Sequence, residues 1–265
     1  MTEILYDHGA AFIAGGLAVG MLTALECGYR LGRPAATRAG EALRAHINSV
    51  QTSLLGLLAL IIGFTFALAL QHYDARSAAV VTEANAIGTT WLRSGLLSGN
   101  AGSEVRELLR RYVDARITES HIPLSQLTRR AGVVAQDQTL LDQLWQATVH
   151  IVARDSGPVT SGLFVQSLND TIDAFGSNNA VLDRHMPEIV LWILFATFGV
   201  TAAVLGYSAS VADHRPPLAT MLLITLIVLV TYLIIDLDRP RRGLIRVSQT
   251  PLLELQQAMA GTRTP

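Results

Sequence analysis

The stretch LLGLLALIIGFTFALAL, residues 54–70, decides the fold of this chain. It lies inside an uncharged run, residues 47–71, that is bounded by His46 and His72. A helix rises 1.5 Å per residue, so a run of this length exceeds the roughly 30 Å hydrocarbon core of a bilayer. The run therefore predicts a membrane-spanning helix.

Three further stretches lack charge, and the chain as a whole is 50% hydrophobic and only 15% charged. The first, residues 9–25, is shorter than the roughly 20 residues of a typical span, and Tyr29 is placed to anchor its end at the interface. The other two, residues 189–212 and 216–235, are long enough to cross. We therefore expect four transmembrane helices, at about residues 9–27, 48–71, 188–211 and 216–236.

The polar middle of the chain has helical periodicity, because Val105, Leu109, Tyr112 and Val113 fall on one face of a helix. No alternating pattern of useful length predicts a strand. The sequence thus predicts an all-α integral membrane protein with a helical soluble domain between its second and third membrane helices. The expected divisions are a first hairpin at 1–71, the soluble domain at 72–186, a second hairpin at 187–236 and a tail at 237–265.

The second membrane helix is expected to continue into the soluble domain, because residues 71–93 contain no proline and only one glycine, Gly88. Such a helix would tie the membrane part of the chain mechanically to the soluble bundle.

Composition argues against several classes of function. All 20 basic residues are arginine, and the formal net charge is −1. The chain therefore has no overall positive charge that would attract nucleic acid. Cys27 is the only cysteine, and the seven histidines include no pair at i, i+4, which leaves no recognisable metal site. Glycine-rich phosphate loops and nucleophile motifs are missing. We therefore predict neither an enzyme nor a bound cofactor or metal.

The second membrane helix carries two notable patterns of spacing. A seam of small residues repeats at steps of three and four, which lets another helix approach closely. A second row, at i, i+4, would project apolar rings if identical helices surrounded an axis. From periodicity alone, packing in a protein core is favoured over a pore. The seam is Thr52, Gly56, Ala59 and Gly63, and the row is Gly56, Leu60 and Phe64.

The fourth membrane helix ends in an acidic and basic cluster. Carboxylates at mid-membrane cost roughly 2.5 to 3.5 kcal/mol on insertion scales, so Asp236 and Asp238 are expected at the interface. There they would form structural ion pairs with Arg239, Arg241 and Arg242. The alternative is that the two carboxylates bind a cation or couple the tail to a pore.

Six stretches together resemble one family of membrane proteins. They are GYRLGR (28–33), LLGLLALIIGFTFALALQHYDAR (54–76), EANAIGTTWLRSGLL (83–97), RRYVDARI (110–117), LNDTIDAF (168–175) and IDLDRPRRGLIRVSQTPL (235–252). They are similar to the bestrophin-like domain-of-unknown-function family of bacteria and plants, and more distantly to bestrophin channels.

The resemblance implies an oligomeric, pentameric ion channel whose second membrane helix lines the pore. It implies a neck at Leu60 and Phe64, with Gly56 at a position that is normally large, and it does not carry over calcium gating. Ion selectivity stays open and would depend on charges at the pore mouth, such as Asp74 and Arg76. The implied partners are the lipid bilayer, further copies of the chain and inorganic ions, but not nucleic acid.

The same resemblance implies the bacterial inner membrane, with the soluble domain and both termini in the cytosol. A slight arginine majority on that face agrees with this orientation, whereas the charge around the first helix favours the opposite one. The alternative function is a membrane-anchored scaffold or sensory protein without conduction.

Overall fold

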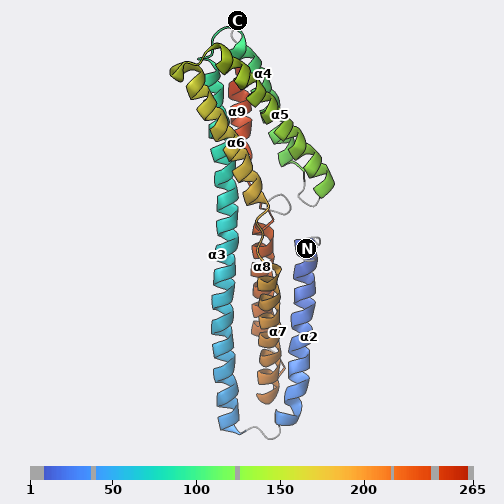
Figure 1. Ribbon diagram of the computed structural model, residues 1–265. Helices are drawn as coiled ribbons and strands as arrows, with labels where there is room; N and C mark the ends of the chain where they lie inside the picture. Colours follow the sequence, from blue (N-terminus) through green and yellow to red (C-terminus); the bar gives the residue numbers. More distant parts are fainter. Residues whose placement is uncertain (1–8, 37–39, 123–125, 216–217, 240–244, 262–265) are drawn as a thin grey trace. The chain divides into compact units, whose positions relative to one another are not determined.

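The computed structural model describes residues 9–36, 40–122, 126–215, 218–239 and 245–261 (Figure 1). Within those ranges the regular structure is entirely helical, which confirms the predicted all-α class. The helices are α2 (Ala10–Ala36), α3 (Glu41–Ser94), α4 (Ala101–Ser120), α5 (Leu127–Arg154), the π-helical turn η1 (Pro158–Gly162), α6 (Leu163–Leu182), α7 (Glu188–Val211), α8 (Leu218–Leu237) and α9 (Thr250–Gly261).

Four of these helices, α2, α3, α7 and α8, are long and apolar enough to cross a membrane. The protein is therefore an integral membrane protein with four transmembrane helices. Two limits differ from the expected ones: α2 continues to Ala36, and α3 begins at Glu41. The expected limits were placed where the uncharged runs end. Arginine favours helix about as well as leucine does, so the helices continue into the charged residues beyond those runs.

The helix α3 runs without interruption from Glu41 to Ser94, which confirms that the second membrane helix continues past residue 71. It ends in a short turn before α4. Gly99 in that turn has a φ of 65°, a left-handed conformation that glycine adopts without steric cost.

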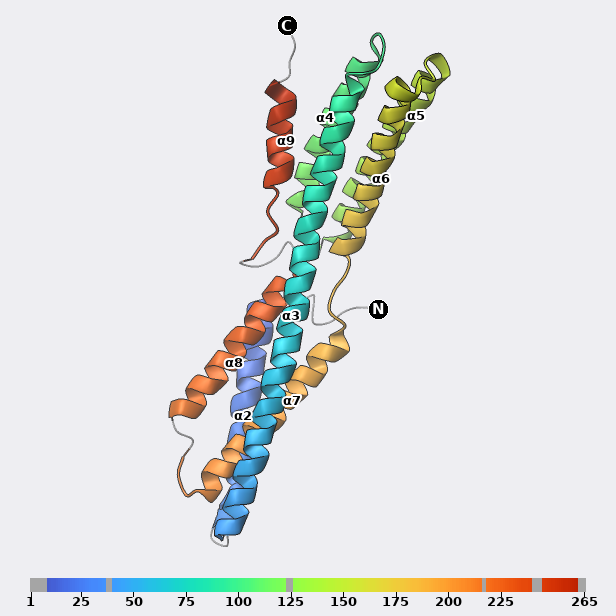
Figure 2. The ribbon, with the colours of Figure 1, turned by 90° about the vertical axis from the view of Figure 1, so that its left-hand side faces the viewer.

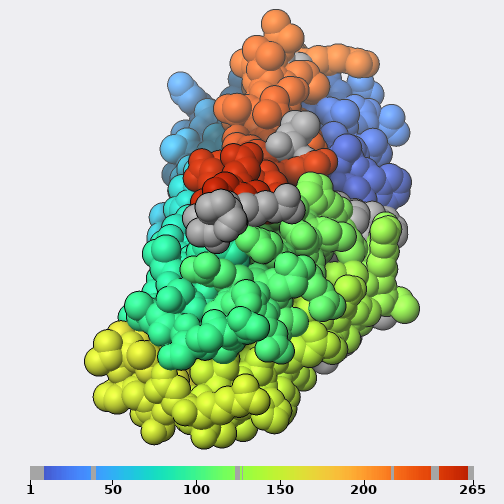
Figure 3. Space-filling model, turned by 90° about the horizontal axis from the view of Figure 1, so that it is seen from above, coloured from blue at the N-terminus to red at the C-terminus, as the bar shows by residue number. Residues whose placement is uncertain are grey.

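The chain divides into two compact units. The membrane unit consists of residues 1–71 and 185–238, and the helical unit consists of residues 72–184 and 239–265. The C-terminal segment thus groups with the helical unit, where α9 lies against α4 (Figure 3). Leu252 and Met259 of α9 are buried in the same apolar core as Leu109 and Tyr112 of α4.

In the membrane unit, α2 and α7 lie side by side (Figures 1 and 2). Glycines allow this approach, because a Cβ atom at Gly28 would overlap the backbone of Ala203, and one at Gly206 would overlap the backbone of Leu25. Small residues at such crossings bring helix backbones into van der Waals contact, the main attraction between helices in lipid. The crossing of α2 and α7 is therefore built on glycines.

We predict that Gly28→Ala destabilises the protein by about 1–3 kcal/mol, because the added methyl group overpacks the crossing of α2 and α7. Gly20 on the same helix is the matched control, since a Cβ atom there meets nothing within 4 Å. Thermal unfolding in detergent measures both variants. Equal melting temperatures for Gly28→Ala and Gly20→Ala would contradict the assignment of the crossing.

Candidate functional site

The membrane stretch of α3 has one covered face and one open face. Leu58 and Ala69 are 3% and 0% exposed and lie on the covered face. Leu60 and Phe64 lie on the other side of the helix and are 54% and 68% exposed. Successive residues are rotated by about 100° around a helix, so both faces follow from one helix orientation. Within a single chain, the two neck candidates contact no covering helix.

The small-residue seam also lies on the open face. Thr52, Gly56, Ala59 and Gly63 are all exposed, and a Cβ atom at either glycine would meet nothing within 4 Å. The seam is therefore not used in packing within the chain. The crossing that is used involves Gly28 of α2, which sequence reasoning missed although Gly28 and Gly32 have the small-x-x-x-small spacing of helix contacts.

The two mouth-charge candidates are on different sides of α3. Asp74 is exposed, whereas Arg76 is 1% exposed. The Nη2 atom of Arg76 donates a hydrogen bond to the carbonyl oxygen of Arg184 at 2.6 Å. The guanidinium group is therefore held inside the helical unit, and only the carboxylate is displayed on the open face.

The acidic end of α8 is buried. Asp236, Asp238 and Arg239 are 1%, 2% and 6% exposed. The backbone N–H of Met186 donates to the Oδ2 atom of Asp238 at 3.0 Å, which joins the end of α8 to the segment that precedes α7. Arg241 and Arg242 lie outside the described residues, so their pairing with these carboxylates stays a prediction.

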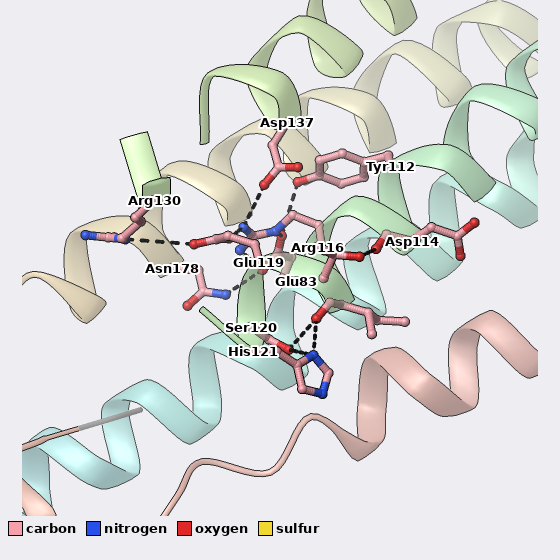
Figure 4. A network of polar contacts seen from close by, with 12 residues as sticks. Glu83, Tyr112, Asp114, Arg116, Glu119, Ser120, His121, Arg130, Asp137 and Asn178 are labelled. Carbon is pink, nitrogen blue, oxygen red and sulfur yellow. Dashed lines mark hydrogen bonds and ion pairs between the residues drawn. The ribbon is translucent and has the colours of Figure 1, made fainter. Parts of the chain in front are cut away.

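A second cluster, the Arg116 network, lies in the interior of the helical unit (Figure 4). Arg116 of α4 binds Glu83 of α3 with two hydrogen bonds, Nε to Oε1 at 2.6 Å and Nη2 to Oε2 at 3.0 Å. Its Nη1 atom donates to Glu119 and also to Oδ2 of Asp137 on α5 at 3.2 Å. One guanidinium group thus contacts three carboxylates from three helices.

Neutral and basic groups complete the network. Tyr112 donates its hydroxyl to Oε1 of Glu83 at 3.1 Å, and Asn178 of α6 donates to Oε2 at 2.5 Å. The ring of Phe175 lies 5.0 Å from the Arg116 guanidinium carbon. Arg130 of α5 approaches Glu119, with Nε 3.8 Å from Oε1. The network therefore links α3, α4, α5 and α6.

Burial and charge shift the acid–base behaviour of two groups in the network. Burial raises the pKa of the Tyr112 hydroxyl, and the adjacent Glu83 carboxylate raises it further. Burial by itself lowers the pKa of Arg116, but the charge and hydrogen bonds of Glu83 outweigh it and raise the pKa above its usual value. Tyr112 therefore stays neutral and Arg116 stays charged at physiological pH.

The network has the character of a structural centre rather than a reaction site. The side chains of Arg116, Glu83, Glu119 and Asp137 are at most 2% exposed, so no substrate reaches them in this fold. Among the described residues, no group of histidine, cysteine, aspartate and glutamate is arranged to hold a metal ion. Apolar periodicity missed this centre because charged residues are expected on the outside of helices.

We predict that Arg116→Met lowers the free energy of unfolding of the helical unit by about 3–5 kcal/mol, because it leaves the buried carboxylates of Glu83 and Asp137 without their counter-charge and Glu119 with Arg130 alone. Arg111→Met is the control, since Arg111 lies on the same helix but is exposed. Its effect should stay within about 0.5 kcal/mol. Chemical unfolding followed by circular dichroism measures the free energy of unfolding of both variants. Similar losses of stability in Arg116→Met and Arg111→Met would contradict the structural role of Arg116.

A further prediction concerns alkaline pH. The folded state raises the pKa of Tyr112, so its stabilising contribution is complete below the unfolded pKa of about 10 and is lost as the pH rises towards the folded value. Tyr112→Phe should cost about 1–2 kcal/mol at pH 8, where it removes the hydrogen bond to Glu83. The difference from wild type should shrink between pH 9 and 11. Parallel stability curves over that interval would show that Tyr112 ionises equally in both states.

Comparison with known proteins places this arrangement in a family. Residues 22–252 match the family model described as the Bestrophin-like domain. No curated protein sequence matches this chain.

Solved structures share the fold at low sequence identity. A bacterial bestrophin homolog from Klebsiella pneumoniae aligns over 93% of this chain and 99% of its own, with 12% identity and a TM-score of 0.66. A substituted form of that homolog aligns over 91% and 98%, with 12% identity and a TM-score of 0.65. The family match covers most of the sequence, and the chain belongs to the Bestrophin-like domain family.

Proposed function

We propose that this chain is the subunit of an oligomeric, pentameric ion channel in which α3 lines the pore. The observation that carries the proposal is the open face of α3, which displays small residues and two large apolar residues without a partner from its own chain. A single helix per subunit encloses a path only when several copies surround an axis.

The small residues on the open face of α3 favour contact with another protein helix over contact with lipid. Without a hydrophobic force between helices in a bilayer, association depends on close packing, and Gly, Ala, Ser and Thr are enriched where helices meet. Gly56 and Gly63 have open space around them in the single chain. Neighbouring copies of the protein are the proposed occupants of that space.

The order of residues along the open face agrees with a path that is polar at both ends and apolar in its middle. Exposed polar residues, Ser49 and Ser53, lie before the apolar middle, and Gln71 and Asp74 lie after it. Rings of Leu60 and Phe64 between them would form the neck. Ions lose hydration there without gaining polar ligands, so the neck sets the barrier to conduction.

The same proposal assigns the protein to the bacterial inner membrane, with the helical unit in the cytosol. The arginines between residues 30 and 44, around the end of α2 and the start of α3, oppose this orientation, and those that follow α8 support it. No catalytic role is proposed for the buried Arg116 network.

We predict that Leu60→Ala and Phe64→Ala increase the current through purified protein reconstituted in planar bilayers. A barrier lowered by about 1 kcal/mol corresponds to about a fivefold larger current. Leu226→Ala is the matched control, because Leu226 is 60% exposed but belongs to α8 and not to the helix proposed to line the pore. Its current should equal that of wild type.

The oligomeric state of the same preparations is measured in detergent. A ring of subunits with current in the neck variants supports the channel. A monomer with no current in wild type, Leu60→Ala or Phe64→Ala would contradict the proposal and favour a membrane-anchored scaffold.

A further inference from the structure

The Arg116 network borders a small cavity in the helical unit. The walls of this cavity come from α3, α4, α6 and the C-terminal segment. The centre of a water molecule can move within about 20 Å³ of it. A space of about 10–15 Å³ on the same measure already holds one water molecule. The polar residues that line the cavity are Arg76, Arg116, Ser120, Asn178 and Gln249.

Two of these residues bind the same carboxylate oxygen. Arg116 donates from Nη2 to Oε2 of Glu83 at 3.0 Å, and Asn178 donates from Nδ2 to the same atom at 2.5 Å. Figure 4 shows the amide oxygen of Asn178 turned away from Glu83. The side chains of Arg116 and Asn178 therefore lie side by side at one wall of the cavity.

This wall has one hydrogen-bond donor and one acceptor to spare. A guanidinium group carries five N–H groups, and Glu83 takes two of those of Arg116, from Nε and Nη2. Nη1 donates to Glu119 and Asp137, which leaves one N–H on Nη2 among the bonds to described residues. Asn178 is 3% exposed, and its Oδ1 atom accepts no hydrogen bond from any residue that the structure describes.

A ligand for this cavity therefore has to accept one hydrogen bond and donate another. Buried polar groups without a partner cost free energy, so both spare groups favour a ligand. A chloride ion accepts from Arg116, but the partial negative charge on Oδ1 of Asn178 repels it. A sodium ion suits Oδ1, but the charges of Arg76 and Arg116 repel it. A water molecule accepts and donates without a net charge.

We propose that this cavity is a specific site for one internal water molecule, which accepts a hydrogen bond from Arg116 and donates one to Oδ1 of Asn178. Ser120 and Gln249 offer further polar groups, and an internal water typically makes about three hydrogen bonds. Because Gln249 belongs to the C-terminal segment, the water molecule joins that segment to the Arg116 network. The site lies within the helical unit and is independent of the proposed channel function.

The bound species is identified by structure determination of the full chain in detergent, with NaBr in place of NaCl. A map that shows other internal waters should show one peak about 2.5–3.0 Å from Oδ1 of Asn178, without the anomalous scattering of bromide. An anomalous peak at that position would overturn the proposal in favour of an anion. The absence of any peak there, in a map that shows other internal waters, would overturn it as well.

A substitution that fills the cavity is the second experiment. Val247 is 9% exposed and lines the cavity, and Val247→Ile adds one methyl group. The methyl group displaces the water molecule and leaves Oδ1 of Asn178 without its partner. The melting temperature in detergent should therefore fall by about 2–4 °C. Filling a dry cavity stabilises a protein, so a rise in the melting temperature would contradict the proposal.

Overpacking also lowers a melting temperature, so the same substitution is made in the Asn178→Leu background. Leucine has no oxygen that needs a partner, and Val247→Ile should cost little there. The bond from Asn178 to Glu83 is lost in both members of that pair, so its effect cancels in the double-mutant cycle. An equal fall in both backgrounds would attribute the effect to overpacking and overturn the proposal. If Asn178→Leu does not fold, the map of the wild-type protein decides.

Discussion

The two hydrogen bonds between Arg116 and Glu83 set the orientation of α3 within the helical unit, on which the placement of its other charged residues there depends. A buried carboxylate is tolerated only with a charged and hydrogen-bonded partner, so Glu83 must face the interior of the helical unit. On a helix this requirement also decides which residues face outward. Arg76, two turns earlier, faces inward with Glu83, whereas Asp74 and Val81 face outward.

The energetic role of this network is orientation more than stability. Three carboxylates and two arginines must lose most of their hydration, and their mutual attraction offsets much of that cost without a large surplus. An apolar core could stabilise four helices equally well, but it would accept small rotations of α3. The hydrogen bonds that Tyr112, Arg116 and Asn178 donate to the Glu83 carboxylate are directional, so they allow few such rotations. The motifs EANAIGT and RRYVDARI, which carry much of the family resemblance, contain both halves of the central pair.

Small residues serve the membrane unit in two places. Gly28 and Gly206 bring α2 and α7 together inside the chain, where substitution would force backbones apart. Gly56 and Gly63 on α3 have the same chemical character but meet nothing in their own chain. The first pair explains how the unit packs, and the second supports the proposal that packing continues between copies. Both sets follow from the weak hydrophobic force between helices in lipid, which leaves close contact as the main attraction.

The sequence by itself determined the four membrane helices, the helical middle and the unbroken α3, because these depend on local properties: uncharged length, period and the absence of proline. It also determined the family, through motifs that are continuous in the chain. It did not determine which of Asp74 and Arg76 faces outward, whether the Gly56 and Gly63 seam is covered, or that Arg116 is buried. Those answers needed the tertiary structure, because the period of a helix defines its faces but not what lies against each face. Only the packing of distant segments, such as Glu83 against Arg116, makes one face interior and the other open.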